Sequence, residues 1–484
     1  MNLKRDFVLN ILFLLAVNLL IKPFFIFGID RSVQNEVGPA EYGMYFSMLN
    51  FTYLFQIVID FGIQNFNNRN IAQNSQLLNK YFSHIMVLKF GLAIIYSLIV
   101  IFAAILFNYS WEHLNILLLL VCNQIFISFT FYFRSNISGL QHYFTDSLLS
   151  VLDRVLLIII CSVLLWANPF GQHFRITWFV YAQTATYSAT ALIAFSQVYK
   201  HLKAVKLKWN KAFQWWLLRE SFPYALAIFL MSVYTRIDGV MIERMIDANE
   251  SGLYAAAYRL LDASNMIGLL FAGLLLPMYA RQLKDGTPVL QLSRFSFKTI
   301  WAASAALASG SFAFRNELMH LLYNGANDYS GELLGWLMLS FPAVCTMYIF
   351  GALLTSNGNL RQMNWLFGFS VVFNIVCNFI LIAKFKALGG AYSTLITQYI
   401  VAIAQIFIAQ RTFKWRTNFK IITQVLSFAA LCFAVFYLCK NTLFYTNNPT
   451  NWMLQFATGA ILTILASFLF KLIDVKRTLD VFRN

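Results

Sequence analysis

The chain has 484 residues, of which 59% are hydrophobic and 12% are charged, and its mean hydropathy is +0.63. Soluble domains carry about 25% charged residues, so the composition excludes a soluble globular protein and predicts an integral membrane protein. The formal net charge of +16 does not indicate nucleic-acid binding, because the Lys and Arg residues gather in loops on one side of the predicted spans.

Fourteen apolar segments are long enough to cross a bilayer as helices. Each is a continuous run rather than an alternating one, which argues against a strand barrel. The first is longer than the apolar part of a signal peptide and is expected to be retained. In chain order the predicted spans are 7–29, 42–60, 81–107, 113–133, 146–166, 176–199, 220–243, 252–280, 296–314, 331–356, 362–383, 389–410, 420–439 and 452–471.

The Lys and Arg residues of the loops orient these spans. If the amino terminus lies inside, most of these residues fall on the inner side, as the positive-inside rule requires. The loops assigned to the outer side hold Arg31, Arg175, Arg244, Arg315, Lys384, Lys386 and Lys440. Both termini are therefore predicted to be cytoplasmic.

A weak internal repeat relates the two halves of the chain. AEYGMY (Ala40–Tyr45) opens the second span and NESGLY (Asn249–Tyr254) opens the eighth, so an E-x-G-x-Y pattern recurs six spans later. Gly139 and Gly358 follow the fourth and tenth spans. Six is an even number, so the repeats run in the same direction across the membrane, which predicts a pseudo-two-fold axis along its normal.

The predicted fold is therefore an all-α integral membrane protein with two six-helix lobes, residues 1–200 and 220–411. Residues 201–219 between them form a basic linker with three Trp residues, expected to lie on the inner membrane surface. Residues 412–484 add two helices and a cytoplasmic tail. The six Cys residues fall within apolar runs without a CxxC pair, so no metal site is predicted.

Charged residues inside the spans are the candidate functional residues, because each costs about 2.5–3.5 kcal/mol at mid-span. In the seventh span Arg236 and Asp238 are two residues apart, so their side chains face different ways on a helix. One is expected to face a cavity and the other a neighbouring helix. A membrane carboxylate is a candidate for coupling to Na⁺ or H⁺, so Asp238 is either such a site or a structural partner.

Arg259 and Asp262 of the eighth span are spaced i, i+3 and are predicted to pair. The pair is either a structural salt bridge or a cavity arginine held ready by its aspartate, and we favour the second interpretation. Lys22 precedes Pro23, which kinks a helix. Its ammonium either reaches a central cavity or extends toward the outer headgroups.

Three further intramembrane charges have structural explanations. Arg154 is adjacent to Asp153, and a loose pair or contacts with neighbouring helices both fit. Lys89 lies two turns inside the cytoplasmic end of the third span and is expected to extend to the headgroups. Asp60 beside Gly62 fits the turn that ends a helix, and it is kept as a coupling candidate.

No soluble catalytic domain is visible, and the sequence has neither G-x-x-x-x-G-K-[ST] nor HExxH. We therefore expect no enzyme, no catalytic residue and no cofactor. An ATP-driven pump is disfavoured for the same reason, so a gradient of Na⁺ or H⁺, or the membrane potential, is expected to supply any drive.

Several motifs resemble one family. KPFFIFGIDR (Lys22–Arg31) and IDFG (Ile59–Gly62) resemble the start of polysaccharide exporters, and TRIDGVMI (Thr235–Ile242), ESGLYAAAYRLLD (Glu250–Asp262) and LLLPMYAR (Leu274–Arg281) resemble their middle. The chain is thereby similar to the Wzx-type lipid-linked O-antigen or polysaccharide flippases of the multidrug/oligosaccharidyl-lipid/polysaccharide (MOP) exporter superfamily.

The resemblance implies a two-lobed, alternating-access transporter in the bacterial cytoplasmic (inner) membrane. It implies a polyprenyl-pyrophosphate-linked oligosaccharide as substrate, with membrane lipids and polysaccharide-assembly membrane proteins as further partners. Arg259 takes the position of the cavity arginine that lipid II flippases of the superfamily require. Those proteins also have an arginine in the second span, and no basic residue lies between Tyr42 and Asp60 here. This departure weighs against the peptidoglycan precursor.

The functional hypothesis is thus a glycolipid flippase for O-antigen or another surface polysaccharide. Arg259, Lys22, Arg236 and Arg154 are the candidates for binding pyrophosphate or glycan, because Arg offers a bidentate fork to phosphate. Asp238, Asp262 and Asp60 are the candidates for ion coupling. The alternative within the superfamily is a cation-coupled multidrug exporter, whose cavity is expected to be net acidic. An integral-membrane polymerase and a scaffold without transport are less favoured.

Overall fold

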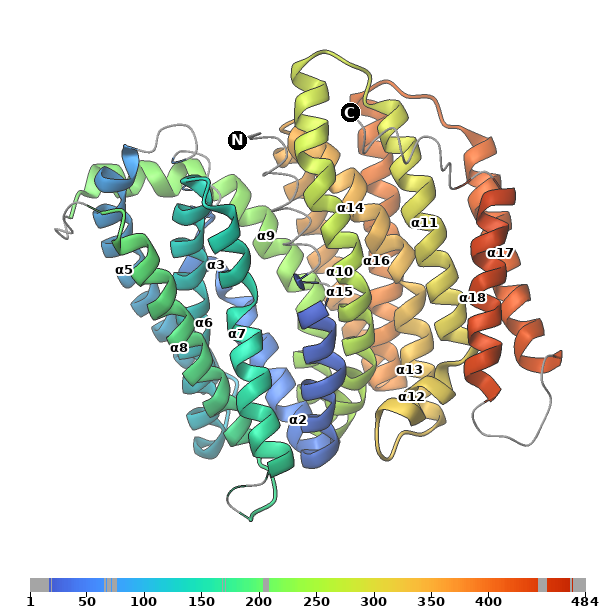
Figure 1. The fold of residues 1–484 in the computed structure, drawn as a ribbon, viewed down its shortest axis with the longest axis horizontal. Helices are drawn as coiled ribbons and strands as arrows, with labels where there is room; N and C mark the ends of the chain where they lie inside the picture. The colour runs from blue at the N-terminus through green and yellow to red at the C-terminus, as the bar shows by residue number, and fades with distance from the viewer. Residues whose placement is uncertain are drawn as a thin grey trace. The chain divides into compact units, whose positions relative to one another are not determined.

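The computed structural model describes residues 17–18, 20–64, 67, 71, 76–167, 169, 171–202, 209–442, 451–470 and 472. Within these residues all regular secondary structure is helical (Figure 1). The chain forms two compact units, Met1–Gly252 and Leu253–Asn484. The predicted lobes, 1–200 and 220–411, were defined by the sequence repeat, and their boundaries differ from those of these two units. The lobes stay a prediction.

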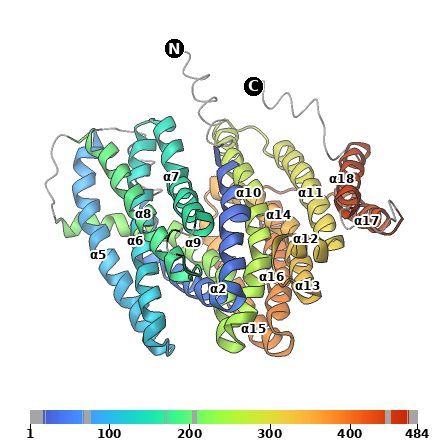
Figure 2. The same ribbon diagram turned by 60° about the horizontal axis from the view of Figure 1, so that its bottom comes forward.

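The first unit is a bundle of apolar helices in which α6 packs on α8 and on α2, and α7 packs on α8 (Figures 1 and 2). A π-helical turn, η1, leads directly into α2, which kinks at Gly38, whose φ is +80°, next to Pro39. The elements are η1 (Phe25–Asp30), α2 (Arg31–Leu54), α3 (Gln56–Asp60), α5 (Leu77–Leu106), α6 (Trp111–Gly139), α7 (Tyr143–Ser162), η2 (Val163–Ala167), α8 (Ile176–Tyr199) and α9 (Lys211–Met245).

The second unit contains most of α10 (Ala248–Lys284), whose first turn belongs to the first unit. In this unit α15 packs on α16, and α11 packs on α14, α13, α17 and α18. A capping box at Asn327 and Ser330 starts α13. The remaining elements are α11 (Leu290–Ala313), α12 (Arg315–Leu322), α13 (Asp328–Leu339), α14 (Phe341–Ser356), α15 (Leu360–Phe385), α16 (Ala387–Thr412), α17 (Phe419–Thr442) and α18 (Asn451–Leu469).

Ten helices within the described part of the chain are long and apolar enough to cross a membrane. They coincide with ten of the fourteen predicted spans. The predicted second, sixth and ninth spans are also helical, in α2, α8 and α11, but are not among these ten. Most of the first predicted span, 7–29, lies outside the described residues. The all-α membrane class is confirmed.

The predicted linker 201–219 lies only partly within the described residues, since 203–208 fall outside them. Its second half is the beginning of α9, which starts at Lys211 and is capped by the Asn210 side chain. Trp209 and Trp215 are 68% and 71% exposed. Exposed Trp beside Lys and Arg is typical of a segment at a membrane–water boundary.

Candidate functional site

The two charges of α9 lie in different surroundings. The Asp238 side chain is 1% exposed. Arg236 is partly exposed, and its guanidinium carbon lies 5.5 Å from the centre of the Tyr53 ring on α2, a cation–π contact within the first unit. The two side chains therefore differ in burial, and which of them faces a cavity stays a prediction.

Beside Asp238, glycine residues let α9 and α10 approach α2 closely. A Cβ at Gly239 would lie 2.7 Å from the Phe46 ring and 2.8 Å from the Asn50 amide. A Cβ at Gly43 would overlap the backbone of Ala248 and Gly252, and one at Gly252 would overlap the Pro39 carbonyl. The two glycines of the repeated E-x-G-x-Y motif thus lie against each other at one helix crossing.

Polar side chains reinforce this crossing. The Ser251 hydroxyl lies 3.3 Å from the Gly43 carbonyl and 3.2 Å from the Gly239 carbonyl. The Gln34 amide donates to the Gly252 carbonyl at 3.0 Å. Ser47 donates to the Glu243 carboxylate at 3.3 Å. The predicted orientation places this contact near the outer side of the membrane, where it joins the start of α10 to α2.

A cationic cluster lies in the first unit. Arg154 donates from Nη1 to the Tyr187 hydroxyl at 3.2 Å, and its guanidinium carbon lies 4.8 Å from the centre of the Phe25 ring. Its Nε is 3.6 Å from Oδ2 of Asp153, so the predicted loose pair is present. The charges that act on Lys22 are those of Arg154, Asp153 and Arg134. The structure therefore brings two predicted site residues, Lys22 and Arg154, together.

Lys89 differs from its prediction. Its side chain is 0% exposed, so it does not extend to the headgroups. The ammonium donates to the Ser128 hydroxyl at 2.7 Å and to the Ile59 carbonyl at 3.3 Å, and it lies 3.6 Å from Asp60 Oδ1. The turn predicted after Asp60 is present, with Phe61 at φ +47° as a left-handed cap. The ammonium of Lys89 is stable inside the unit because these three oxygen atoms compensate the cost of burying its charge.

The sequence analysis did not single out Asp30, a buried carboxylate that precedes the last residue of the KPFFIFGIDR motif. It is 2% exposed and accepts a 2.7 Å hydrogen bond from the Tyr42 hydroxyl. The Tyr42 ring contacts the Tyr45 ring, whose hydroxyl accepts a 2.7 Å hydrogen bond from Gln183. The available signal was a carboxylate directly after the first predicted span, 7–29.

In the second unit Arg259 and Asp262 pair as the i, i+3 spacing predicts. Nη1 of Arg259 is 3.6 Å from Oδ2 of Asp262, and their side chains are 15% and 20% exposed. This distance exceeds the 2.7–2.9 Å or so of a tight charge-assisted hydrogen bond. The two groups thus form a loose ion pair.

The second unit also holds buried amide and hydroxyl groups between α15 and α16 that carry no charge and were not singled out in the sequence. Asn374 Nδ2 lies 3.2 Å from the Ser393 hydroxyl and 3.4 Å from the Thr397 hydroxyl. Asn378 donates to Asn374 Oδ1 at 3.1 Å. Such a network stabilises the packing of two apolar helices.

The ten long apolar helices define a polytopic membrane protein rather than a single-span one. A sequence profile described as "Polysaccharide biosynthesis protein" matches residues 7–282, more than half of the chain. The chain belongs to this polysaccharide biosynthesis family. The ten apolar helices and this membership support the predicted place of the chain as a multi-pass protein of the bacterial inner membrane.

Solved structures share the fold at low sequence identity. The lipid II flippase MurJ, in an inward closed conformation, has a TM-score of 0.72 and 14% identity, covering 95% of this chain and 98% of that one. An inward-facing multidrug resistance MATE family transporter of the MOP superfamily has a TM-score of 0.64 and 14% identity, covering 80% and 94%. A MOP superfamily transporter from Pyrococcus furiosus has 0.57 and 14%, covering 84% and 94%. These matches confirm the predicted MOP fold.

No curated protein sequence matches the chain.

Proposed function

We propose that the chain moves a polyprenyl-pyrophosphate-linked oligosaccharide from the inner to the outer leaflet by alternating access. The glycan would be the repeat unit of an O-antigen or of another surface polysaccharide. The observation that carries the proposal is the pair of partly exposed guanidinium groups on apolar helices, Arg154 in the first unit and Arg259 in the second, in a member of a polysaccharide biosynthesis family.

The chemistry of a pyrophosphate explains why such groups suit it. A pyrophosphate cannot cross hydrocarbon without partners that replace its water. Arg154 and Arg259 offer forked donors that match phosphate oxygens, and Lys22 adds a point charge beside Arg154. Outward movement of an anion is favoured by about 2.3 kcal/mol per charge for each 100 mV of inside-negative potential. The prenyl tail remains in the lipid throughout.

The proposed topology has fourteen spans with both termini inside and two six-helix lobes related by a pseudo-two-fold axis. The helical second, sixth and ninth spans in α2, α8 and α11 support the count.

We place ion coupling at Asp238, because its carboxylate is buried on the membrane helix α9. Either Na⁺ or H⁺ fits a membrane carboxylate. Flipping in vesicles under imposed Na⁺, H⁺ or potential gradients tests this assignment. If Asp238→Asn keeps the wild-type ion dependence, the coupling carboxylate lies elsewhere.

The transport test compares Arg259→Ala and Arg259→Lys in cells that lack the gene. We expect lipid-linked glycan to accumulate on the cytoplasmic side with Arg259→Ala, and partial display with Arg259→Lys, which keeps the charge and loses the fork. Arg281→Ala is the matched control, since Arg281 lies at the other end of α10 and is 83% exposed. Full display with Arg259→Ala contradicts a ligand role for Arg259.

A cation-coupled multidrug exporter is the second candidate, because MATE transporters share the fold. A cavity for cationic drugs is expected to be net acidic, whereas Arg154 and Lys22 lie together with one adjacent aspartate in the first unit. Deletion of the gene separates the two functions. A drug exporter predicts increased drug susceptibility with normal glycan display, and a flippase predicts the reverse.

The proposal also assigns partners: the lipid-linked glycan, the surrounding lipids and membrane proteins of polysaccharide assembly. Cross-linking in cells that make the glycan tests the last of these.

A further inference from the structure

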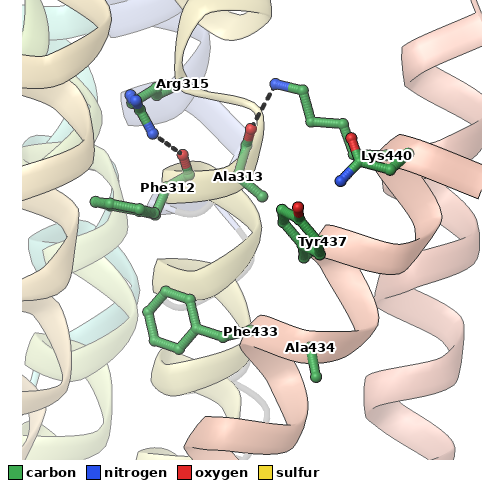
Figure 3. A pocket seen from close by; sticks show the side chains of 8 residues that line it. Phe312, Ala313, Arg315, Phe433, Ala434, Tyr437 and Lys440 are labelled. Carbon is green, nitrogen blue, oxygen red and sulfur yellow. Dashed lines mark hydrogen bonds between the residues drawn. The ribbon is translucent and has the colours of Figure 1, made fainter.

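A pocket of about 570 Å³ lies in the second unit, between the end of α11 and the last turns of α17 (Figure 3). The rings of Phe312, Phe433 and Tyr437 and the methyl group of Ala434 form its apolar part. Arg315 and Lys440 lie at its upper edge in Figure 3, on either side of Ala313. The pocket is therefore apolar along its length and basic at one end.

The charge at this end is positive. Lys440 Nζ is 2.7 Å from Glu317 Oε1 and donates to the Ala313 carbonyl at 2.7 Å. Arg315 donates from Nη1 to the Phe312 carbonyl at 3.2 Å and makes no ion pair within the described part of the chain. Two cations and one carboxylate leave a single excess positive charge. Arg315 also keeps unused N–H donors, because a guanidinium carries five.

The depth of the pocket matches a lipid molecule. The apolar span of α17 runs from Phe419 to Asn441, so Lys440 lies in its last turn at the membrane–water boundary. Tyr437 and Phe433 lie one and two turns deeper and are 67% and 37% exposed on the outside of the unit. A headgroup phosphate at the boundary and an acyl chain below it would fill both parts, whereas a small anion would fill only the first.

We propose that this pocket binds an anionic phospholipid. Its phosphate lies between Arg315 and Lys440, and one acyl chain lies against Phe433, Ala434 and Tyr437. The single excess positive charge complements the single negative charge of a phosphodiester. The lipid would join α17 to the end of α11, so it stabilises the attachment of the last two helices. This site is separate from the candidate transport residues and does not depend on the transported substrate.

The experiment measures phosphatidylglycerol binding to the purified full chain by native mass spectrometry. Phosphatidylcholine with the same acyl chains and inorganic phosphate are the comparison ligands. Wild type is expected to bind phosphatidylglycerol preferentially and to gain thermal stability from it. Arg315→Gln is expected to weaken that binding at least about tenfold, because a charge-assisted hydrogen bond is lost.

Two further variants keep the proposal falsifiable if Arg315→Gln fails to fold. Ala434→Trp fills the pocket without changing charge, and Glu317→Gln with Lys440→Met removes the ion pair without stranding a carboxylate. Ala434→Trp is expected to lose the preference for phosphatidylglycerol, and the double variant, which keeps the charge of Arg315, is expected to weaken it. Lys384→Met removes an exposed cation at the end of α15 and is expected to keep the preference. Unchanged preference in Ala434→Trp, or equal stabilisation by phosphatidylcholine or inorganic phosphate, would overturn the proposal.

Discussion

The buried pair of Lys89 and Asp60 offers a prediction with a clear sign. Asp60→Asn removes the counter-ion of an ammonium that is 0% exposed and leaves it only the Ser128 hydroxyl and the Ile59 carbonyl. Removing one partner of a buried pair costs about 3–5 kcal/mol. We expect this variant to lose stability on that scale.

The reverse substitution should cost less. Lys89→Met leaves a carboxylate that is 26% exposed and can still be hydrated. The Ser128 hydroxyl also keeps its 3.4 Å hydrogen bond to the Ile59 carbonyl. We expect a loss of about 1–3 kcal/mol, the cost of one poorly satisfied polar group. The double variant with Asn at 60 should recover most of the larger loss, because neutral replacement of a buried pair is often nearly neutral.

Thermal unfolding of the purified variants in one detergent measures this order. The double-variant cycle separates pairing from general damage, since independent sites give additive effects. Arg281→Met is a control, because its contact with Asp285 is long and highly exposed. Additive single effects, or equal stability of Asp60→Asn and wild type, would refute the interpretation of Lys89 as a paired internal cation.

Two other predictions follow from the structure. Gly252→Ala places a methyl group against the Pro39 carbonyl, so it should reduce the free energy of unfolding by about 1–3 kcal/mol and also reduce transport. Gly273→Ala in the same helix is the control, because its methyl group meets nothing within 4 Å. The control should be neutral or stabilising in the same unfolding and transport assays. Partial burial and the positive charges of His142 and Lys200 lower the pKa of His201. Its folded form therefore binds a proton less readily than its unfolded form, and stability should fall as pH drops below about 6.5. His201→Gln should flatten that part of a stability–pH profile, and an unchanged profile would contradict the assignment.

The sequence predicted what depends on neighbours along one helix. Long apolar runs gave the helices, and the i, i+3 spacing gave the contact of Arg259 with Asp262. Helical phase predicted different faces for Arg236 and Asp238, which differ in burial. These features are local, so no knowledge of helix packing was needed to infer them.

Contacts between distant segments were not predictable in the same way. Lys89 has apolar neighbours in the sequence, and the oxygen atoms that its ammonium contacts belong to α3 and α6. Asp30 depends on Tyr42, across the kinked start of α2. In both cases the partner lies on a segment distant in the sequence. Such a contact depends on which helices pack together, and a single sequence does not reveal that packing.

The partners of the intramembrane cations separate structural charges from candidate ligands. Lys89 is fully buried, and its three oxygen contacts come from two other helices, so releasing it for a substrate would strand Asp60 and disrupt helix packing. Arg154 and Arg259 instead pair at 3.6 Å with a carboxylate of their own helix and remain 28% and 15% exposed. A counter-ion on the same helix lowers the cost of inserting the cation. Arg154 also donates to the Tyr187 hydroxyl of α8 and lies over the Phe25 ring, and both of these contacts are with neutral groups. A pyrophosphate that displaces the same-helix carboxylate would not break an ion pair between two helices, so Arg154 and Arg259 are better candidate ligands than Lys89.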